Sequence, residues 1–402
     1  MVRTGVWIIG ARGGVATTML TGAIALRHGL TATTGLITST ELFEGVPLAE
    51  PGELVFGGHD IRTTPLAECA AEISRANLTI HPQLLDRIAP DLDEIDKNLR
   101  TGITFRSGAA IESLPGVASD ANVDHPGEAL ARIEHDLNEF QETHQIDRLV
   151  VVNLASTEPP LPDHPAHASA EKLEAALAAG ESEAFIASTL YALAAARVGA
   201  AFLNFTPSPG ALLPAVAEAL EAAGSPFMGS DGKTGETLVK SALAPMFRYR
   251  NLRVLSWQGY NMLGDRDGEV LAHQENKATK IESKDQLLHD YLGYPLHSKV
   301  AIDYVPSLDD MKTAWDFIHF EGFLGVKMSL QFTWQGCDSI LAAPLVIDLV
   351  RLLDLAKKTG GAGVQPHLAL FFKSPHNGTE HDLHRQFHRL VEYLATARNS
   401  EG

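Results

Sequence analysis

The sequence predicts an α/β protein whose first domain is a doubly wound parallel sheet. Short apolar runs alternate with alanine-rich helical segments through the first half of the chain, which is typical of parallel strands joined by helices. The first run, Val6–Ile9, leads into a glycine-rich turn and then a helical stretch. After Phe247 strand-like runs dominate, which predicts a second and more antiparallel layer before helical sequence returns at Ser339.

The expected elements follow from hydrophobic periodicity and from the glycine and proline residues between them. In the first part, strands are expected at 6–9, 34–38, 149–154 and 201–205, and helices at 19–28, 126–143, 168–198 with a break near Gly180, and 211–223. Later strands are expected at 252–257, 299–305, 325–334 and 368–372, and later helices at 339–358 and 381–397. We therefore expect a first domain over 1–247, an inserted α+β domain over 248–338, and a segment over 339–402 that returns to the first domain.

Length and composition describe a globular chain with well-filled cores. Its 402 residues are 45% hydrophobic and 20% charged, enough for one large or two ordinary domains. The 32 basic residues are outnumbered by 50 acidic ones, and the net charge of −18 disfavours nucleic acid and anionic membrane surfaces as partners. A phosphorylated ligand must therefore be held by a local cluster of lysines and backbone amides.

Cysteine usage and hydropathy indicate a protein of the reducing cytoplasm. Cys69 and Cys337 have no zinc-ligand spacing, and they suggest no disulfide framework. The opening apolar run Val6–Ile9 is too short for a signal peptide. The later apolar run Ser339–Leu353 contains Asp348 and other residues that are costly in lipid, so we expect no membrane span.

The glycine-rich turn after the first strand is a candidate site for the pyrophosphate of a dinucleotide. Backbone N–H groups and the helix dipole at such a turn favour an anion. The spacing of Gly10, Gly13 and Gly14 departs from G-x-G-x-x-G, so a purely structural tight turn stays the alternative. No lone acid stands about 20 residues further on for the ribose hydroxyls, where the rule places it. Glu41 is too distant by that rule, and Asp60 is another candidate.

Residues 230–241 contain a Gly-Lys-Thr sequence before an apolar run, which raises the question of a nucleotide triphosphate loop. A P-loop needs a glycine five residues before the glycine of Gly-Lys-Thr, and Phe227 stands at that position. The segment therefore lacks the P-loop fingerprint, which argues against an ATPase. Asp231 and Lys233 must then have another role.

Two further polar segments follow predicted strands. They are 153–159, Asn-Leu-Ala-Ser-Thr-Glu-Pro, and 204–210, Asn-Phe-Thr-Pro-Ser-Pro-Gly. Ligands of open α/β sheets bind beyond the carboxyl ends of the strands, so both segments are expected to face one crevice. The alternative for each is a loop whose serine or threonine caps a helix.

Lysines recur in the second half of the chain at positions that suggest a functional cluster. Lys277, Lys280 and Lys284 share one face of a predicted helical turn, for which a solvated surface is the alternative. Lys312 stands in an apolar neighbourhood, and Lys373 ends an apolar run. Loss of solvent at Lys373 would lower the pKa of its ammonium and suit it to proton transfer.

The final predicted helix carries His381, His384 and His388 on one face. Such a stripe can in principle ligate a divalent metal, but no carboxylate or second ligand set is clearly placed beside it. We therefore interpret the stripe as a polar surface and expect no metal site.

Eight motifs in order along the chain together resemble the myo-inositol-1-phosphate synthases, and within them the shorter archaeal-type branch. They are Ile-Gly-Ala-Arg-Gly-Gly-Val-Ala-Thr-Thr (9–18), Phe-Gly-Gly-His-Asp (56–60), the two polar segments 153–159 and 204–210, Tyr-Asn-Met-Leu-Gly-Asp-Arg-Asp-Gly (260–268), Asn-Lys-Ala-Thr-Lys (276–280), Ala-Ala-Pro-Leu-Val-Ile-Asp (342–348) and Phe-Phe-Lys-Ser-Pro (371–375). The resemblance covers nearly the whole chain and is far more specific than a glycine turn alone.

The resemblance implies a Rossmann-type domain made from both chain ends and a middle domain that forms a homotetramer interface and closes the active site. It also implies NAD as the cofactor and a hexose 6-phosphate as the substrate. In the implied reaction, bound NAD⁺ accepts hydride from C5 of glucose 6-phosphate, and a proton then leaves C6. The resulting enolate closes on the C1 aldehyde in an intramolecular aldol step, and the retained NADH returns the hydride to C5.

The resemblance further implies the residues of the site. Lys373 would lie beside the C5 oxygen, Lys280 and Lys312 would lie around the phosphate and the closing carbon–oxygen groups, and Lys284 completes the cluster. The acidic positions that would orient these lysines or exchange protons with them are Asp231, Asp267 and Asp338. The implied cofactor residues are Gly10, Ala11, Arg12, Gly13, Gly14, Val15, Asp60, Asn153, Ala155, Ser156, Thr157, Asp231 and Ser374. The implied substrate residues are Thr206, Ser208, Lys233, Asn261, Leu263, Lys280, Lys284, Lys312 and Lys373.

Two departures from the family pattern leave the substrate open. Gln258 and Gly259 precede Tyr260 where relatives usually carry other small or polar residues, and 104–108 lacks an Asn-Cys-Gly-Ser stretch associated with the archaeal branch. Cyclisation of glucose 6-phosphate to myo-inositol 1-phosphate is the first hypothesis. Cyclisation of fructose 6-phosphate to a five-membered cyclitol phosphate, as in carbocyclic nucleoside antibiotic pathways, is the second. A third is an NAD-binding regulator without catalysis, which the retained lysines and aspartates disfavour.

Overall fold

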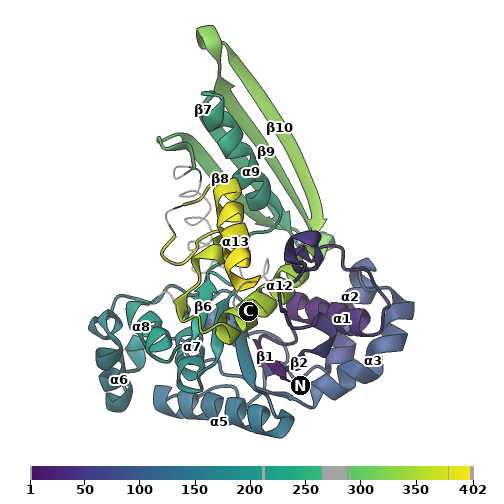
Figure 1. Cartoon of the computed structure of the whole chain (residues 1–402), viewed down its shortest axis with the longest axis vertical. Helices are drawn as coiled ribbons and strands as arrows, with labels where there is room; N and C mark the ends of the chain where they lie inside the picture. The colour runs from purple at the N-terminus through teal and green to yellow at the C-terminus, as the bar shows by residue number, and fades with distance from the viewer. Residues whose placement is uncertain (1, 211–212, 265–287, 289–290, 379, 399–402) are drawn as a thin grey trace.

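The computed structural model describes residues 2–210, 213–264, 288, 291–378 and 380–398. Within them the chain forms a seven-stranded sheet and a four-stranded sheet. The seven-stranded sheet and its helices make up the broad base of the molecule, and the four-stranded sheet projects from this base (Figure 1). The predicted α/β fold class with a second layer is therefore confirmed.

The seven-stranded sheet is parallel, with the strand order β11-β6-β5-β4-β1-β2-β3. Six of these strands follow the order of doubly wound dinucleotide-binding sheets, in which the order reverses between β1 and β4. The strands are β1 Thr4–Ile9, β2 Val55–Asp60, β3 Leu99–Thr101, β4 Arg148–Asn153, β5 Ala201–Asn204, β6 Pro226–Gly229 and β11 Gly363–Val364. Because β11 comes from the C-terminal part of the chain, the sheet is built from both chain ends, as expected.

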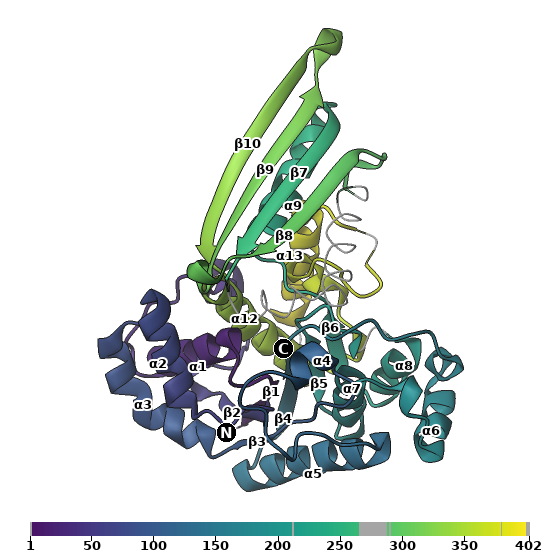
Figure 2. The ribbon, with the colours of Figure 1, turned by 180° about the vertical axis from the view of Figure 1, so that it is seen from behind.

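Helices cover both faces of this sheet, and each face has its own apolar core (Figure 2). Val6 and Ile8 of β1 lie in one core with α1, α2, α3 and α12, whereas Trp7 and Ile9 lie in the other with α5, α6, α7 and α8. This alternation follows from the two-residue period of a strand. The helices are α1 Gly14–Arg27, α2 Leu66–Asn77, α3 Pro82–Asp96, α4 Ala109–Glu112, α5 Pro126–His144, α6 Ala170–Ala179, α7 Ala187–Arg197, α8 Pro214–Ala222, α9 Gly235–Tyr249, α12 Asp338–Lys358 and α13 Leu383–Arg398. None of the helices in the described ranges is both long and apolar enough to cross a membrane.

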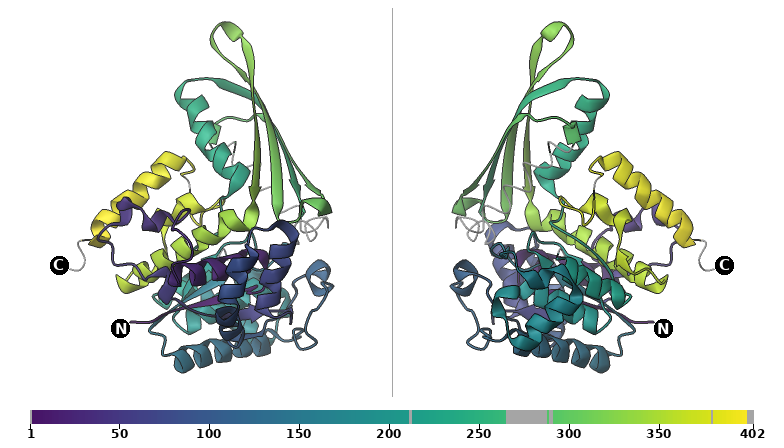
Figure 3. Two further views of the ribbon diagram at one scale, coloured as in Figure 1. Left: turned by 90° about the vertical axis from the view of Figure 1, so that its right-hand side faces the viewer. Right: turned by 90° about the vertical axis from the view of Figure 1, so that its left-hand side faces the viewer.

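The four-stranded sheet has the order β10-β9-β7-β8 and is mixed. β9 pairs antiparallel with β7 and with β10, and β8 pairs parallel with β7. Its strands are β7 Arg253–Leu263, β8 His297–Tyr304, β9 Met311–Glu321 and β10 Lys327–Cys337. α9 lies along one face of this sheet (Figure 3), where Phe247 of the helix packs with Trp257 and Ile318 of the strands in a third apolar core.

Two expected strands were wrong. Residues 34–38 form turns and the start of a 3₁₀ helix, Ile37–Ser39, because the carboxylate of Asp348 accepts the backbone N–H groups of Ile37 and Thr38. The second strand is β2 instead. Residues 368–372 lie mostly in a 3₁₀ helix, Pro366–Phe371, and the C-terminal part joins the sheet through β11.

Several elements were not expected from periodicity: α2, α3, α9, β3, β6 and β9. β9 is the clearest case, because Lys312 and Asp316 interrupt its apolar pattern. Asp316 is nevertheless fully buried, and it is accommodated by Lys240 and Trp257. A buried charge whose partner is distant in sequence breaks the apolar pattern of a strand, so the strand is not recognised from the sequence.

Candidate active site

The turn between β1 and α1 has the geometry of an anion-binding loop. Gly10 has a φ of +81°, and a Cβ at Gly10 would lie 2.9 Å from the Cα of Ala155 in the loop after β4. A side chain at Gly10 would therefore push the turn away from that loop. At Gly14 a Cβ would meet no atom within 4 Å, and the first turn of α1 contains no acidic residue. The N-terminus of α1 therefore has room beside Gly14 and no acid to repel a phosphate.

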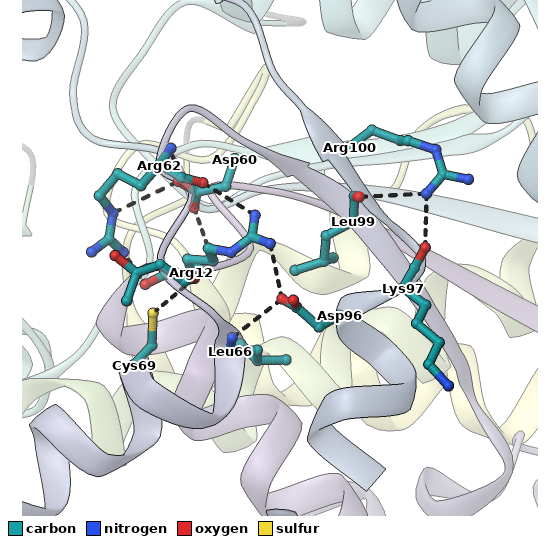
Figure 4. Close-up of polar contacts among 10 residues, drawn as sticks. Arg12, Asp60, Arg62, Leu66, Cys69, Asp96, Lys97, Leu99 and Arg100 are labelled. Atoms are coloured by element: carbon teal, nitrogen blue, oxygen red, sulfur yellow. Dashed lines mark hydrogen bonds and ion pairs between the residues drawn. The ribbon is translucent and has the colours of Figure 1, made fainter. Parts of the chain in front are cut away.

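Asp60, at the end of β2, braces this turn (Figure 4). Its Oδ2 accepts a hydrogen bond from the backbone N of Arg12 at 2.7 Å, and its Oδ1 accepts one from the backbone N of Arg62 at 2.8 Å. The Arg12 guanidinium extends further, to Oδ1 of Asp96 at 2.9 Å. Oδ2 of Asp60 therefore holds the turn, whereas Oδ1 holds the segment after β2, and direct contact of Asp60 with a ribose stays a prediction.

The polar segments after β4 and β5 lie side by side beyond the strand ends. The side-chain amide of Asn153 donates to Oδ1 of Asn204 at 3.1 Å and lies 3.4 Å from Oγ1 of Thr206. Further along, the backbone N of Glu158 donates to Oγ of Ser208 at 3.0 Å. These bonds bring the predicted residues of the two loops to one edge of the sheet.

The segment after β6 is held by the C-terminal part of the chain. Five backbone hydrogen bonds join the two, from Ser230 to Ser374 (2.8 Å), Ser374 to Ser230 (3.2 Å), Lys373 to Asp231 (2.8 Å), Lys233 to Phe371 (2.7 Å) and His376 to Gly229 (2.7 Å). This pairing explains why two motifs that are 142 residues apart share one site.

Lys373 and Asp231 form a buried ion pair at this junction. Nζ of Lys373 lies 2.7 Å from Oδ1 of Asp231, and the two residues are 8% and 5% exposed. The second carboxylate oxygen of Asp231 is buried and accepts no hydrogen bond from any described residue. A carboxylate oxygen that accepts no hydrogen bond and lies beside an ammonium group suits a ligand hydroxyl that donates a hydrogen bond.

Asp338 and Lys312 form a second pair, between the start of α12 and β9. Nζ of Lys312 lies 3.3 Å from Oδ2 of Asp338, and Oγ1 of Thr234 donates to Oδ1 of Asp338 at 3.4 Å. Thr234 follows the segment of Asp231 directly and precedes α9. The second pair is thereby tied to the loop that carries the first.

The four-stranded sheet supplies two further predicted residues. Asn261 and Leu263 are buried on β7 and alternate with half-buried neighbours, so they share the face of the sheet that carries Trp257. Lys280, Lys284 and Asp267 lie outside the described residues, so the structure places only part of the predicted lysine cluster.

Lys233 is oriented toward α13. Its Nζ donates to Oε1 of Gln386 at 2.9 Å, and burial lowers the pKa of the ammonium to about 7. Direct contact with a substrate, as predicted from the sequence, would require this side chain to leave Gln386.

Lys233→Met is expected to stabilise the protein at neutral pH. Between the folded-state pKa of about 7 and the usual value of 10.5, the unfolded chain holds a proton that the folded chain has released. The wild-type free energy of unfolding should therefore gain up to about 1.4 kcal/mol per pH unit from this group as pH rises through that window. Urea unfolding of both proteins across the window measures this gain, which the variant should lack. Lys97→Met, at an exposed position, is the control, and parallel curves for wild type and Lys233→Met would contradict the prediction.

Glu158 is a buried acid that was not predicted as a site residue. Its Oε1 accepts the backbone N–H of Ser188 at the start of α7, at 2.9 Å, and burial raises the pKa of its carboxyl to about 7. Together with the contact to Ser208, Glu158 links α7 to both polar loops. Its position directly after Thr157 in a predicted site loop was the signal that could have identified it.

A buried charge cluster fixes α9 to the four-stranded sheet, and it was also missed. Nζ of Lys240 lies 2.5 Å from Oε1 of Glu236 and 3.4 Å from Oδ1 of Asp316, which also accepts the indole N–H of Trp257 at 2.6 Å. These three charged side chains are at most 2% exposed. The cluster therefore sets the distance between the helix that follows Thr234 and the strands that carry Asn261 and Lys312.

The arrangement can hold a dinucleotide and stabilise negative charge on a neighbouring ligand. The N-terminus of α1, which carries no acid in its first turn, suits a pyrophosphate, and the buried acceptor of Asp231 follows β6 of the same sheet. The ammonium groups of Lys312 and Lys373 can donate to oxygens on which negative charge develops.

A family model described as Myo-inositol-1-phosphate synthase matches residues 4–395 of the chain. The chain belongs to this family. Inositol-3-phosphate synthase 1 of Bacteroides thetaiotaomicron is 35% identical over 100% of this chain and 96% of its own length. Among solved structures, an inositol-3-phosphate synthase from Caenorhabditis elegans has a TM-score of 0.89 at 23% identity, covering 100% of this chain and 88% of that chain. A myo-inositol-1-phosphate synthase-related protein from Thermotoga maritima has a TM-score of 0.79 at 24% identity, covering 98% of both chains.

Membership of the myo-inositol-1-phosphate synthase family confirms the resemblance drawn from the motifs, and the two solved structures confirm the fold. The predicted residues that the structure describes gather along the carboxyl edge of the seven-stranded sheet and the adjoining end of the four-stranded sheet. Their individual roles stay predictions.

Proposed function

We propose that this member of the myo-inositol-1-phosphate synthase family is an NAD-dependent isomerase that cyclises glucose 6-phosphate to myo-inositol 1-phosphate. The family match over nearly the whole chain and the 35% identity to an inositol-3-phosphate synthase support the proposal. The structural observation that carries it is the buried pair of Lys373 and Asp231, which places an ammonium group at the edge of the sheet where a dinucleotide would bind.

When bound, NAD supplies an acceptor for the hydride that leaves C5 and returns this hydride at the end, so the reaction has no net redox change. Lys373, oriented by Asp231, would exchange a proton with the C5 oxygen. Lys312, oriented by Asp338, would stabilise negative charge on the phosphate or on the oxygen of the closing bond. One such preorganised donor is typically worth roughly 3 to 4 kcal/mol.

The remaining site residues are proposed on the same basis. Lys280, Lys284 and Asp267, which lie outside the described residues, would complete the charged cluster around the sugar phosphate. The proposed cofactor contacts are Gly10, Ala11, Arg12, Gly13, Gly14, Val15, Asp60, Asn153, Ala155, Ser156, Thr157, Asp231 and Ser374. The proposed substrate contacts in the described part of the chain are Thr206, Ser208, Lys233, Asn261, Leu263, Lys312 and Lys373.

Product identification tests the function directly. Purified protein with NAD is incubated with glucose 6-phosphate or with fructose 6-phosphate, and the products are assigned by NMR. We expect inositol phosphate from glucose 6-phosphate and no net rise in NADH absorbance, because the cofactor is regenerated in each turnover. NADH formed in proportion to substrate would contradict an isomerisation, and a five-membered cyclitol phosphate formed from fructose 6-phosphate would favour the alternative substrate.

We also propose a homotetramer assembled through the four-stranded sheet. A row of rings runs along β9 and includes one ring from β7: Tyr260 stacks on Trp315 with a centroid distance of 5.6 Å, and Phe317 stacks on His319 at 6.3 Å. At the far end of the sheet, Phe323 is 88% exposed. A partly exposed aromatic row and an apolar hairpin tip favour contact with another subunit.

Trp315→Glu is expected to dissociate the assembly, because it places a charge in the proposed interface. Phe387→Glu, at a similarly exposed position on α13, should leave the molar mass unchanged. Light scattering at micromolar concentration measures both, and a fully active wild-type monomer would contradict the tetramer.

The domain division and the cellular location are proposals as well. The division at 1–247, 248–338 and 339–402 is supported by the strand order, because the four-stranded sheet takes all its strands from the middle range. A cytoplasmic location is supported by the two cysteines, Cys69 and Cys337, which are both free thiols.

A further inference from the structure

We propose that Asp310 is a positioning residue that aims the Asp338–Lys312 pair at the reacting sugar, an inference that rests on the proposed function. Asp310 lies immediately before β9, two residues from Lys312, and was not among the residues predicted from the sequence. Its hydrogen bonds reach the residues on both sides of Asp338 and the backbone of Asp338 itself.

The contacts of Asp310 enclose the start of α12. Its Oδ2 accepts from Sγ of Cys337 at 2.8 Å and from Oγ of Ser339. The backbone N–H of Ser339 also donates to this carboxylate. The backbone O of Asp310 accepts the N–H of Asp338 at 3.1 Å. The residue before Asp338, the residue after it and its own backbone are therefore all bonded to Asp310.

This carboxylate acts as a helix cap supplied from another element. α12 is 21 residues long, and its own N-cap residue, Cys337, provides no capping side chain. An acid that accepts the free N–H groups at a helix N-terminus also interacts favourably with the helix dipole. Asp310 thus fixes the rotation of the first turn of α12, and with it the direction of the Asp338 side chain.

Asp310, which caps α12, and Lys312 both lie at the start of β9. Asp310 and Lys312 flank Met311, the first residue of β9, so bonding α12 to Asp310 bonds it to the backbone that carries Lys312. The 3.3 Å separation between the Asp338 carboxylate and the Lys312 ammonium depends on this attachment. A rotation of the helix start would lengthen that separation, and errors of about 1 Å in such sites can cost roughly 100-fold in rate.

The same network reaches the helix of the predicted cofactor turn. Oγ1 of Thr18 in α1 donates to Oγ of Ser339 at 3.2 Å, and Ser339 in turn donates to Asp310. Thr18 lies about one helical turn after Gly14, where the pyrophosphate is proposed to bind. Asp310 therefore helps to fix the Asp338–Lys312 pair relative to the cofactor helix.

The test compares Asp310→Asn, Asp338→Asn, the double variant and the control Asp309→Asn. Asp309 is the exposed neighbouring acid, and its replacement by asparagine removes the same charge with almost no change in side-chain size. For Asp310→Asn we expect kcat/KM to fall roughly 10-fold to 100-fold, and for Asp309→Asn we expect a change of less than about twofold. Because Asp310 acts through Asp338, the double variant should be no slower than Asp338→Asn alone.

A pH profile distinguishes this role from a general loss of stability. Without a well-placed carboxylate, the Lys312 ammonium loses its proton at lower pH, so the alkaline limb of kcat/KM should move to lower pH in both single variants. A loss that is equal at every pH, or that multiplies with the Asp338→Asn loss, would overturn the proposal. Ser339→Ala, which removes one donor and keeps the charge, should give a smaller loss of the same kind and provides the test if Asp310→Asn does not fold.

Failure of the proposed function gives a different result. If wild-type protein cyclises neither sugar phosphate, the cyclase proposal fails, and the same variants are compared by their affinity for glucose 6-phosphate in titration calorimetry with NAD present. The same lack of additivity between Asp310→Asn and Asp338→Asn is then expected in the binding free energies. Additive losses, or no loss in Asp310→Asn, would overturn the positioning role.

Discussion

Lys373→Ala is expected to lower kcat by roughly 100-fold or more, the range of a general acid–base group, while the protein still binds NAD and sugar phosphate. The ammonium of Lys373 is fixed by Asp231 at 2.7 Å and by the backbone pairing of its segment with the loop after β6. Its loss should therefore damage the first chemical step more than substrate binding. Single-turnover measurement with substrate deuterated at C5 isolates that step.

The stability of Lys373→Ala must be measured beside its rate, because Asp231 would keep a buried charge without a partner. Breaking a buried ion pair from one side typically costs about 3 to 5 kcal/mol. Lys373→Arg separates the two effects. It retains a cation for Asp231 and should recover most of the stability, but guanidinium does not release its proton and should not recover the rate. Near-normal turnover in Lys373→Ala would remove this residue from the mechanism and shift proton transfer to Lys280 or Lys312.

Lys240→Met is expected to produce the largest loss of stability, about 3 to 5 kcal/mol. The substitution leaves Glu236 and Asp316 buried together without the cation that both face, at 2.5 and 3.4 Å. The free energy of unfolding from guanidinium titrations measures the loss, with the slope of the transition as a check on the unfolding model. Lys172→Met removes the same charge from an exposed position and should change stability by less than about 0.5 kcal/mol.

The pH dependence of this cluster gives an independent check. Burial and the neighbouring Glu236 together raise the pKa of Asp316 to about 6, from a usual 3.8, although Lys240 acts in the opposite direction. A raised folded-state pKa means that the contribution of Asp316 to stability is present at low pH and is lost as pH rises toward 6. Glu236→Gln should lower that pKa and reduce the loss.

If Lys240→Met is as stable as wild type, the cluster does not hold α9 on the sheet.

Local pattern was sufficient for the parts of the fold that bury apolar residues with a regular period. The run Val6–Ile9 predicted β1, and the long helical period after Ser339 predicted α12 within one residue of its start. Pattern failed where backbone groups bond to distant side chains, as at Ile37 and Thr38, whose N–H groups are taken by Asp348. It also failed at β9, whose buried Asp316 is accommodated by Lys240 of α9 and Trp257 of β7.

The residues of the candidate site likewise fall into those that sequence motifs identify and those that only the structure identifies. The ordered motifs identified the loops after β1, β4 and β5 and the segment of Lys373, because each motif is a short stretch with distinctive chemistry, and the resemblance that they carry implied Asp231. Asp310 acts through the backbone of another element, so no motif marks it. Glu158 and Lys240 are ionisable residues whose burial cannot be read from their neighbours in sequence.

The sequence by itself determined the class of sheet, the membership of the family and the segments that carry the chemistry, because periodicity and short motifs are local properties of the chain. Only the tertiary structure decided which charges meet. Lys373 reaches Asp231 because the C-terminal segment pairs with the loop after β6, and Asp310 caps α12 because β9 begins beside the start of that helix. Electrostatic and hydrogen-bond energies fall off within a few ångströms, so they depend on strand order and helix placement that no local pattern specifies.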